Sequence, residues 1–455
     1  MASTYVNNLR LNEMATGDGS GTWGTTTNTN LTLIADAFGS ASVTITGTTH
    51  TITIPDGTET DSEARKMVLT LAGSITALNT VTLAPNTANK VWIIQNSAGY
   101  AVSLTQGTGS NVVIPNGGIK MVVADGAGSG AAITDVLDLT GGTGNVGLGS
   151  GNLGTALTTG TDNVAIGEAS LDAVTTGSDN TVVGDNAGGA LTTGGNNVAI
   201  GSGALLVATT AADNTAVGTL ALTANSSGTD NTAVGYAAGD AVTTGDANTF
   251  VGDNAGGATT TADNNTAVGA SALLVSTTGH SNAAVGKDAL VANTTGYSNT
   301  SLGAHTLIAN TTGNNNTAVG RYGLYANTTG GSNVAVGLQA LFAATTADNN
   351  VSIGYQSMLA NTTGAGNVAV GAYALDANTT ASNNTGLGYA ALTANSTGTQ
   401  NVGVGTNALG ANTTAANNTA VGHYSLLSNT TGASNTAVGA HALDANTTAS
   451  SNTAV

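Results

Sequence analysis

The residues of this sequence that could catalyse a reaction are carboxylates, and they do not recur at a fixed spacing. Those in the C-terminal two thirds of the chain include Asp172, Asp185, Asp213, Asp240, Asp253, Asp263 and Asp288. A retaining glycosidase needs two carboxyl groups roughly 5 Å apart, so these acids could form such a site only between chains. Solvated turn acids are the simpler interpretation, and we predict no catalytic residues and no enzymatic activity. A polysaccharide-degrading enzyme with sites between chains is the alternative.

The histidines give little basis for a metal site. His305 and His441 occupy equivalent places in a repeat described below, and His423 the place beside them, so a threefold axis could gather copies of one histidine around zinc or iron. The pattern is not repeated, and the chain has no cysteine. Calcium-binding nonapeptide repeats need Gly-Gly-x-Gly-x-Asp at a nine-residue period, which is absent. We therefore predict no metal site and no cofactor.

The composition is that of a repetitive structural protein. Of 455 residues, 65 are glycine, and only 7% are charged and 3% aromatic. With 25 acidic against 7 basic residues, the net charge of −18 repels nucleic acid and anionic lipid. No apolar run reaches the roughly 18 residues of a membrane-spanning helix, and residues 1–10 do not resemble an export signal. We predict neither nucleic-acid binding nor membrane insertion.

The composition changes near residue 145, since all three prolines and both tryptophans precede it. We predict an N-terminal β domain over 1–140, a transition with a degenerate repeat over 141–162, and regular repeats over 163–455. In the first domain, Asn28, Thr29 and Asn30 could cap a short helix over 31–38 that Gly39 ends in the left-handed conformation. Alternating runs bounded by turn residues predict an antiparallel sheet with strands at 42–46, 50–54, 67–71, 80–83, 91–94, 102–105, 111–114 and 119–123.

The repeat has a strict 17-residue period, and we number its positions from the asparagine that opens each unit. Seventeen units begin between Asn163 and Asn435, and Asn452 opens another. A typical unit reads Asn-Thr-Ala-Val-Gly from Asn316 to Gly320 and continues to Asn-Thr-Thr-Gly at 327–330. Units this short, rich in glycine and β-branched residues, oppose helix and predict stacked coils. The fold class is therefore all-β, with a parallel β-solenoid of 17-residue coils.

The invariant positions assign structural roles. We expect the position-1 amides to hydrogen-bond from coil to coil, as at Asn163, Asn214, Asn265, Asn316, Asn367 and Asn418. Position 5 should be a turn that needs φ > 0 or room for adjacent backbone, as at Gly167, Gly218, Gly269, Gly320, Gly371 and Gly422. Position 4 is Val, Ile or Leu in every unit, and position 9 is mostly Leu, so both are predicted to face the interior. The small position 3 would then form an outer stripe through which three chains associate as a homotrimer.

Positions 13 and 14 carry a Thr-Thr column, and stacked threonines can form flat arrays that bind ice. Adjacent residues of a strand point to opposite faces, so only one threonine row could face outward. An ice-binding or adhesive repeat protein is therefore a further alternative.

The units, for example Asn-Ala-Ala-Val-Gly from Asn282 and Asn-Thr-Thr-Gly from Asn293, resemble repeats of bacteriophage tail fibres and the β-roll head of YadA-type trimeric adhesins. The opening, with Gly-Asp-Gly-Ser-Gly-Thr-Trp at 17–23, resembles the N-terminal domain of marine phage tail fibres. The resemblance implies a virion protein assembled in the host cytoplasm, whose N-terminal domain joins a phage tail or baseplate protein. The repeats would be a stalk, and we expect a host cell-surface receptor to bind a region beyond Val455.

Overall fold

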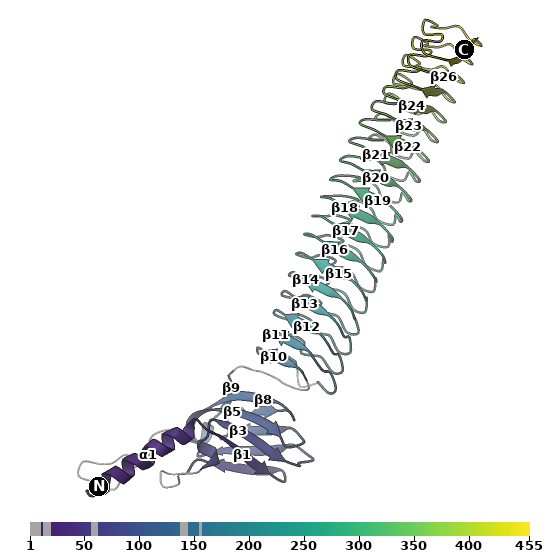
Figure 1. Cartoon of the computed structure of the whole chain (residues 1–455). Coiled ribbons are helices and arrows are strands. Elements are labelled where there is room, and N and C mark those ends of the chain that lie inside the picture. The colour runs from purple at the N-terminus through teal and green to yellow at the C-terminus, as the bar shows by residue number, and fades with distance from the viewer. Residues whose placement is uncertain (1–10, 12–19, 56–61, 137–143, 154–156) are drawn as a thin grey trace. The chain divides into compact units, whose positions relative to one another are not determined.

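The computed structural model describes residue 11 and residues 20–55, 62–136, 144–153 and 157–455. The chain forms two compact units, residues 1–193 and residues 194–455, which we describe separately. The first holds the N-terminal β module and the first coils of the repeat, and the second holds the remaining coils (Figure 1).

The helix of the first unit begins earlier than its expected cap. Helix α1 runs over Trp23–Ala37, so Asn28, Thr29 and Asn30 lie within it. The helix accommodates its threonines, because Thr26, Thr29 and Thr32 donate to the carbonyls four residues earlier at 3.0–3.3 Å. The predicted role of Gly39 is also wrong. The helix ends at Ala37, the residue that follows it, Phe38, has φ −95°, and Gly39 is not left-handed.

The eight strands predicted in this module are all present, and a ninth follows them. Their bounds are β1 Ser40–Ile45, β2 Thr49–Thr53, β3 Val68–Gly73, β4 Asn79–Ala84, β5 Asn89–Ser97, β6 Val102–Thr105, β7 Val112–Ile114, β8 Ile119–Asp125 and β9 Ile133–Asp135. Two 3₁₀ turns, η1 Glu63–Arg65 and η2 Gly128–Gly130, lie between strands.

The sheets are mixed, so the prediction of an antiparallel domain is wrong. One sheet has the order β1-β3-β5-β8-β9 and the other β2-β4-β6-β7. Strands β1 to β6 alternate between the two sheets, so β1, β3 and β5 meet in parallel, as do β2, β4 and β6. Only β7, β8 and β9 pair antiparallel to their neighbours. Alternation between sheets cannot be read from a strand pattern, which reports exposure and not connectivity.

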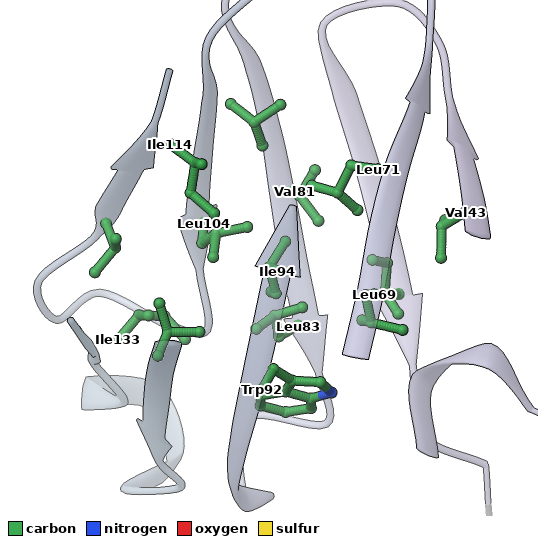
Figure 2. Packing of buried hydrophobic residues seen from close by; sticks show 14 of the residues in the cluster. Val43, Leu69, Leu71, Val81, Leu83, Trp92, Ile94, Leu104, Ile114 and Ile133 are labelled. Carbon is green, nitrogen blue, oxygen red and sulfur yellow. The ribbon is translucent and has the colours of Figure 1, made fainter. Parts of the chain in front are cut away.

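The two sheets enclose one apolar core, shown in Figure 2. Leu69, Leu71 and Ile94 from the first sheet and Val81 and Leu104 from the second are fully buried in it. Trp92 is also buried, and its indole nitrogen donates to the Ala64 carbonyl at 3.2 Å. The core gives this module an ordinary globular interior, unlike the coils that follow.

The predicted parallel β-solenoid is confirmed, with one three-residue strand at positions 2–4 of each full unit. In the first unit these strands are β10 Val146–Leu148, β11 Val164–Ile166 and β12 Thr181–Val183. In the second they are β13 Val198–Ile200, β14 Thr215–Val217, β15 Thr232–Val234, β16 Thr249–Val251, β17 Thr266–Val268, β18 Ala283–Val285, β19 Thr300–Leu302, β20 Thr317–Val319, β21 Val334–Val336, β22 Val351–Ile353, β23 Val368–Val370, β24 Thr385–Leu387, β25 Val402–Val404, β26 Thr419–Val421, β27 Thr436–Val438 and β28 Thr453–Ala454. Successive strands of the second unit stack in parallel with equivalent positions aligned, such as Ala318 against Ala335 (Figure 1).

The orientation predicted for each strand is the reverse of the observed one. Position 3 is buried inside the coil, as at Ala335 with 0% exposure, whereas position 4 faces outward, as at Ile353 with 38%. The coil interior is too narrow for two large side chains. A Cβ at Gly386, a position-3 glycine, would lie 3.4 Å from Cγ of Leu375, the position-9 residue of the coil before it. Position 9 therefore faces inward as predicted, and position 3 must be small because it packs against position 9.

Candidate functional site

Within each of the two units, the position-1 asparagines form a hydrogen-bonded ladder inside the coils. Asn316 Oδ1 accepts from the backbone N–H and from Nδ2 of Asn333, at 3.0 and 3.1 Å. Its own Nδ2 donates to Asn299 Oδ1 at 3.1 Å and to the Gly330 carbonyl at 2.9 Å. Asn163, Asn214, Asn265, Asn367 and Asn418 are likewise fully buried and accept the backbone N–H of the next asparagine. Each amide thus joins two coils and closes a turn of its own coil.

The position-5 glycines are constrained both by backbone angle and by the adjacent coil. Gly167, Gly218, Gly269, Gly320, Gly371 and Gly422 have φ between 115° and 138°. A Cβ at Gly320 would lie 2.8 Å from the carbonyl oxygen of Gly337, the equivalent glycine of the next coil. The glycines stack on one another, so any side chain in this column would meet backbone.

A second asparagine ladder, at position 12, was missed by the reasoning from sequence. Asn310 Nδ2 donates to Asn293 Oδ1 at 2.9 Å and to the Gly313 carbonyl at 3.1 Å, and Asn327 continues the column. These side chains are fully buried. The Asn-Thr-Thr motif could have indicated this second ladder, because its asparagine occupies the same position in ten of the seventeen units. Its burial also removes it as a glycosylation acceptor in the folded chain.

The second ladder is interrupted where position 12 is alanine. Asn327 Oδ1 is buried without a hydrogen-bond partner, because the next coil has Ala344 at this position. We expect Ala344→Asn to raise the free energy of unfolding by about 0.5–1.5 kcal/mol, the net value of a hydrogen bond in a protein. Thermal denaturation measures the gain.

Ala347→Asn serves as the matched control, since position 15 of the same coil contributes only its carbonyl to the ladder. A melting temperature unchanged or lowered by Ala344→Asn would contradict the ladder's contribution to stability.

The two threonine columns have different environments. Position-13 hydroxyls donate to the carbonyl of the equivalent residue in the next coil, as Thr294 does to Thr311 and Thr311 to Thr328, both at 3.0 Å. Position 14 is exposed, as at Thr312 and Thr329. One threonine row is thus occupied by contacts between coils, and a single row faces outward.

The candidate acids serve mainly as turn acceptors. Asp263 Oδ1 accepts the backbone N–H of Asp246 at 2.8 Å, one coil earlier, and Asn314 accepts from Tyr297 in the same way. Asp185 and Asp213 accept from the side-chain amides of Asn186 and Asn196, at 2.9 and 3.1 Å. Asp172 and Asp253 are exposed.

Two acids have more specific surroundings. Burial raises the pKa of the Asp240 carboxyl. Asp288 contacts Lys287 Nζ at 2.8 Å and His305 Nδ1 at 3.5 Å.

Two of the candidate histidines lie near each other. His441 Nδ1 lies 3.0 Å from Asp444 Oδ2, and the rings of His423 and His441 are 5.5 Å apart. Within the described residues, no group of three or more His, Asp or Glu side chains is placed to hold a metal ion.

The outer face of the strands is uncharged, with aliphatic side chains at position 4 and mostly threonine or valine at position 2. Positions 2 and 4 carry no charged residue in any of the seventeen units. In the second unit, position-4 side chains between 37% and 48% exposed are Ile200, Val234, Leu302, Ile353, Leu387, Val421 and Val438. We call positions 2 and 4 of these coils the outer strand face. Exposed apolar surface that continues over many coils is typical of an interaction surface.

Comparison of the chain with models of protein families, with curated proteins and with solved structures gave no match. Among the residues that the structure describes, no helix has both the length and the hydropathy needed to cross a bilayer.

Proposed function

We propose that this chain is a structural fibre protein of a bacteriophage tail, in which the repeats form a stalk. The observation that supports this best is the regular stack of the second unit, whose strands repeat the same register from β13 to β28. Stability in such a stack is a sum of contacts between neighbouring coils, so coils can be added without changing the fold. The resemblance of the repeats to those of tail fibres supports the virion assignment, with assembly in the host cytoplasm.

We propose that three chains associate through the outer strand face. Association through position 3 is ruled out, because that position lies inside the coil. The outer strand face is uncharged, exposes an aliphatic side chain at position 4 and is repeated at the period of the coils. A second copy of the chain offers a surface of the same period. Closed symmetric assemblies are the usual outcome of such self-association.

A trimer should have a mass of three times 43.7 kDa, about 131 kDa. We expect sedimentation to give this mass for the intact chain and the monomer mass for the triple variant Ile353→Glu, Leu387→Glu, Val421→Glu. Association would remove three carboxylates per chain from water. The free energy needed to desolvate these charges exceeds the free energy gained from the apolar contacts.

The control is Thr363→Glu, Thr397→Glu, Thr431→Glu, which adds the same charge in the same coils at the exposed position 14. A monomeric intact chain would exclude the trimer. An intact trimer in the Ile353 variant would exclude the outer strand face as its contact.

The N-terminal module is proposed to attach the stalk to a tail or baseplate protein. Helix α1 leaves Trp23, Leu31 and Phe38 exposed, at 67%, 58% and 72%, which supports a contact there. Immunogold labelling of virions encoding this chain, with an antibody against the repeats, should mark fibres on the tail. Deletion of residues 1–140 should move the chain to the particle-free fraction of the lysate. Label absent from particles of the full chain would contradict the proposal.

A further inference from the structure

Aromatic side chains gather at one corner of the later coils. Six of the eight tyrosines between residues 145 and 455 stand at positions 6, 7 or 10 of units from Asn316 onward, accompanied by histidines and a phenylalanine. We call this set the aromatic corner: His305, Tyr322, Tyr325, Phe342, Tyr355, Tyr373, Tyr389, His423, Tyr424 and His441.

The rings contact one another within and between coils. Tyr325 stacks on Phe342 with centroids 4.9 Å apart, and His305 stacks on Tyr322 at 5.6 Å. Further along, Tyr373 lies edge-on to Tyr355 at 5.3 Å and to Tyr389 at 5.9 Å. Tyr355 and Tyr389 nevertheless remain 42% and 54% exposed. The corner thus presents ring surface to solvent over several consecutive coils.

The coil does not require these rings. The units from Asn265 and Asn401 have no ring at positions 6, 7 or 10, yet they form the same strand and the same turn. Position 7 also has φ near 60°, as at Tyr322, Tyr373 and Tyr424, and a bulky residue adopts that conformation at a cost. Other units place Asn254 or Asn407 there, residues that tolerate it better. Strain retained without a structural need is typical of functional positions.

Groups that form directional hydrogen bonds stand beside the rings. The Arg321 guanidinium lies 4.4 Å over the Tyr322 ring and donates to its hydroxyl at 2.6 Å. Gln356 donates to Gln339 at 2.7 Å at position 7 of adjacent coils. Planar amides and hydroxyls next to open ring faces suit a partner with an apolar face and a hydroxyl rim, which describes a pyranose sugar.

We propose that the aromatic corner binds a neutral polysaccharide lying along the stack of coils. Successive coils are about 4.8 Å apart, a spacing comparable with the length of one sugar unit in an extended glycan, so rings in adjacent coils meet successive sugars. The net charge of −18 disfavours an acidic polysaccharide. Each ring contributes a weak contact, and the repetition along one polymer raises the overall affinity. This binding does not depend on the chain being a tail fibre.

Affinity electrophoresis of the full chain tests the proposal, in native gels containing hydroxyethylcellulose, dextran or galactomannan. We expect retardation by at least one of these neutral glycans.

The triple variant Tyr355→Ala, Tyr373→Ala, Tyr389→Ala tests the role of the rings. It should raise the Kd for that glycan at least tenfold, with an unchanged far-ultraviolet spectrum. The control Tyr236→Ala removes an exposed position-6 ring, and the coils on either side have no ring at positions 6, 7 or 10, so this variant should bind as the intact chain does. If the triple variant does not fold, Arg321→Ala with Gln356→Ala provides the second test and should also weaken binding.

Three results would overturn the proposal. The first is the absence of retardation in all three gels. The second is equal retardation of the intact chain and the folded triple variant. The third is self-association of the chain that the triple variant abolishes, because the aromatic corner would then be a contact between copies.

Discussion

Replacing Phe250 by alanine should destabilise the surrounding coils by about 3–5 kcal/mol, the usual cost of removing a buried phenylalanine. Phe250 occupies position 3, where fifteen of the seventeen units have Ala, Ser or Gly, yet it is fully buried. The coil accepts the ring because position 9 is glycine in its own unit and in the one before it. A Cβ at Gly256 would lie 2.4 Å from the ring, and one at Gly239 would lie 2.7 Å from it.

The compensation can be tested by restoring the usual residues. In the Phe250→Ala background, Gly239→Leu and Gly256→Leu should recover most of the lost stability, because they recreate the interior of an ordinary coil. In the intact chain, the same two leucines should destabilise by overpacking. Hydrogen exchange of residues 231–264 localises the effect, since coil stability depends on nearest neighbours. Strictly additive changes across this set of variants would refute the packing account.

Gly320→Ala should destabilise its coil by about 2–5 kcal/mol, because it combines an unfavourable φ with overpacking. The φ of Gly320 is 115°, and the added methyl would meet the Gly337 carbonyl. Positions 7, 9 and 17 also have positive φ, but near 50–60°, where residues other than glycine are tolerated, as at Tyr322, Leu324 and Ser332. Thermal and denaturant unfolding measure the loss.

Gly323→Ala is the matched control three residues away in the same coil. Its Cβ would lie no closer than 3.4 Å to any other atom, and other units already have alanine there, as at Ala340. This variant should therefore be neutral or slightly stabilising. Equal effects of the two substitutions would show that the position-5 column is not specially constrained.

The period, the strand positions and the glycine turn could be predicted from the sequence because each repeats in every unit. The direction of each strand could not. Alternation shows that Ala318 and Val319 face opposite ways, and hydrophobicity suggested that valine was inside. Which side chain faces the interior depends on the space that the position-9 residue, such as Leu324, leaves inside the coil. The sequence of one unit does not show how large that space is. The exceptions contained the missing information, since Val182 and Phe250 occur beside the position-9 glycines Gly188 and Gly256.

The polar interior was only half predicted for a related reason. The invariant Asn316 was assigned to a ladder, whereas Asn327 was not, because its column is broken by Ala344 and other small or apolar residues. In the N-terminal module, the core strands could be located, but their order depends on chain crossings between two sheets. The side of a helix or strand that meets another chain lies outside what one sequence reveals.

The ladders have a consequence for how such a gene can change in length. The amide hydrogen bonds of the position-1 ladder join equivalent positions of adjacent coils, so deletion of residues 316–332 would place Asn333 beside Asn299 with the partners that Asn316 has now. Recombination between near-identical units can therefore shorten or extend the stack by whole coils, about 4.8 Å each, without a folding defect. Insertions of other sizes must be absorbed in a turn, as in the 18-residue step from Asn145 to Asn163, which keeps the amide contact at 2.9 Å. The length of this protein can evolve in discrete steps while its surface chemistry stays the same.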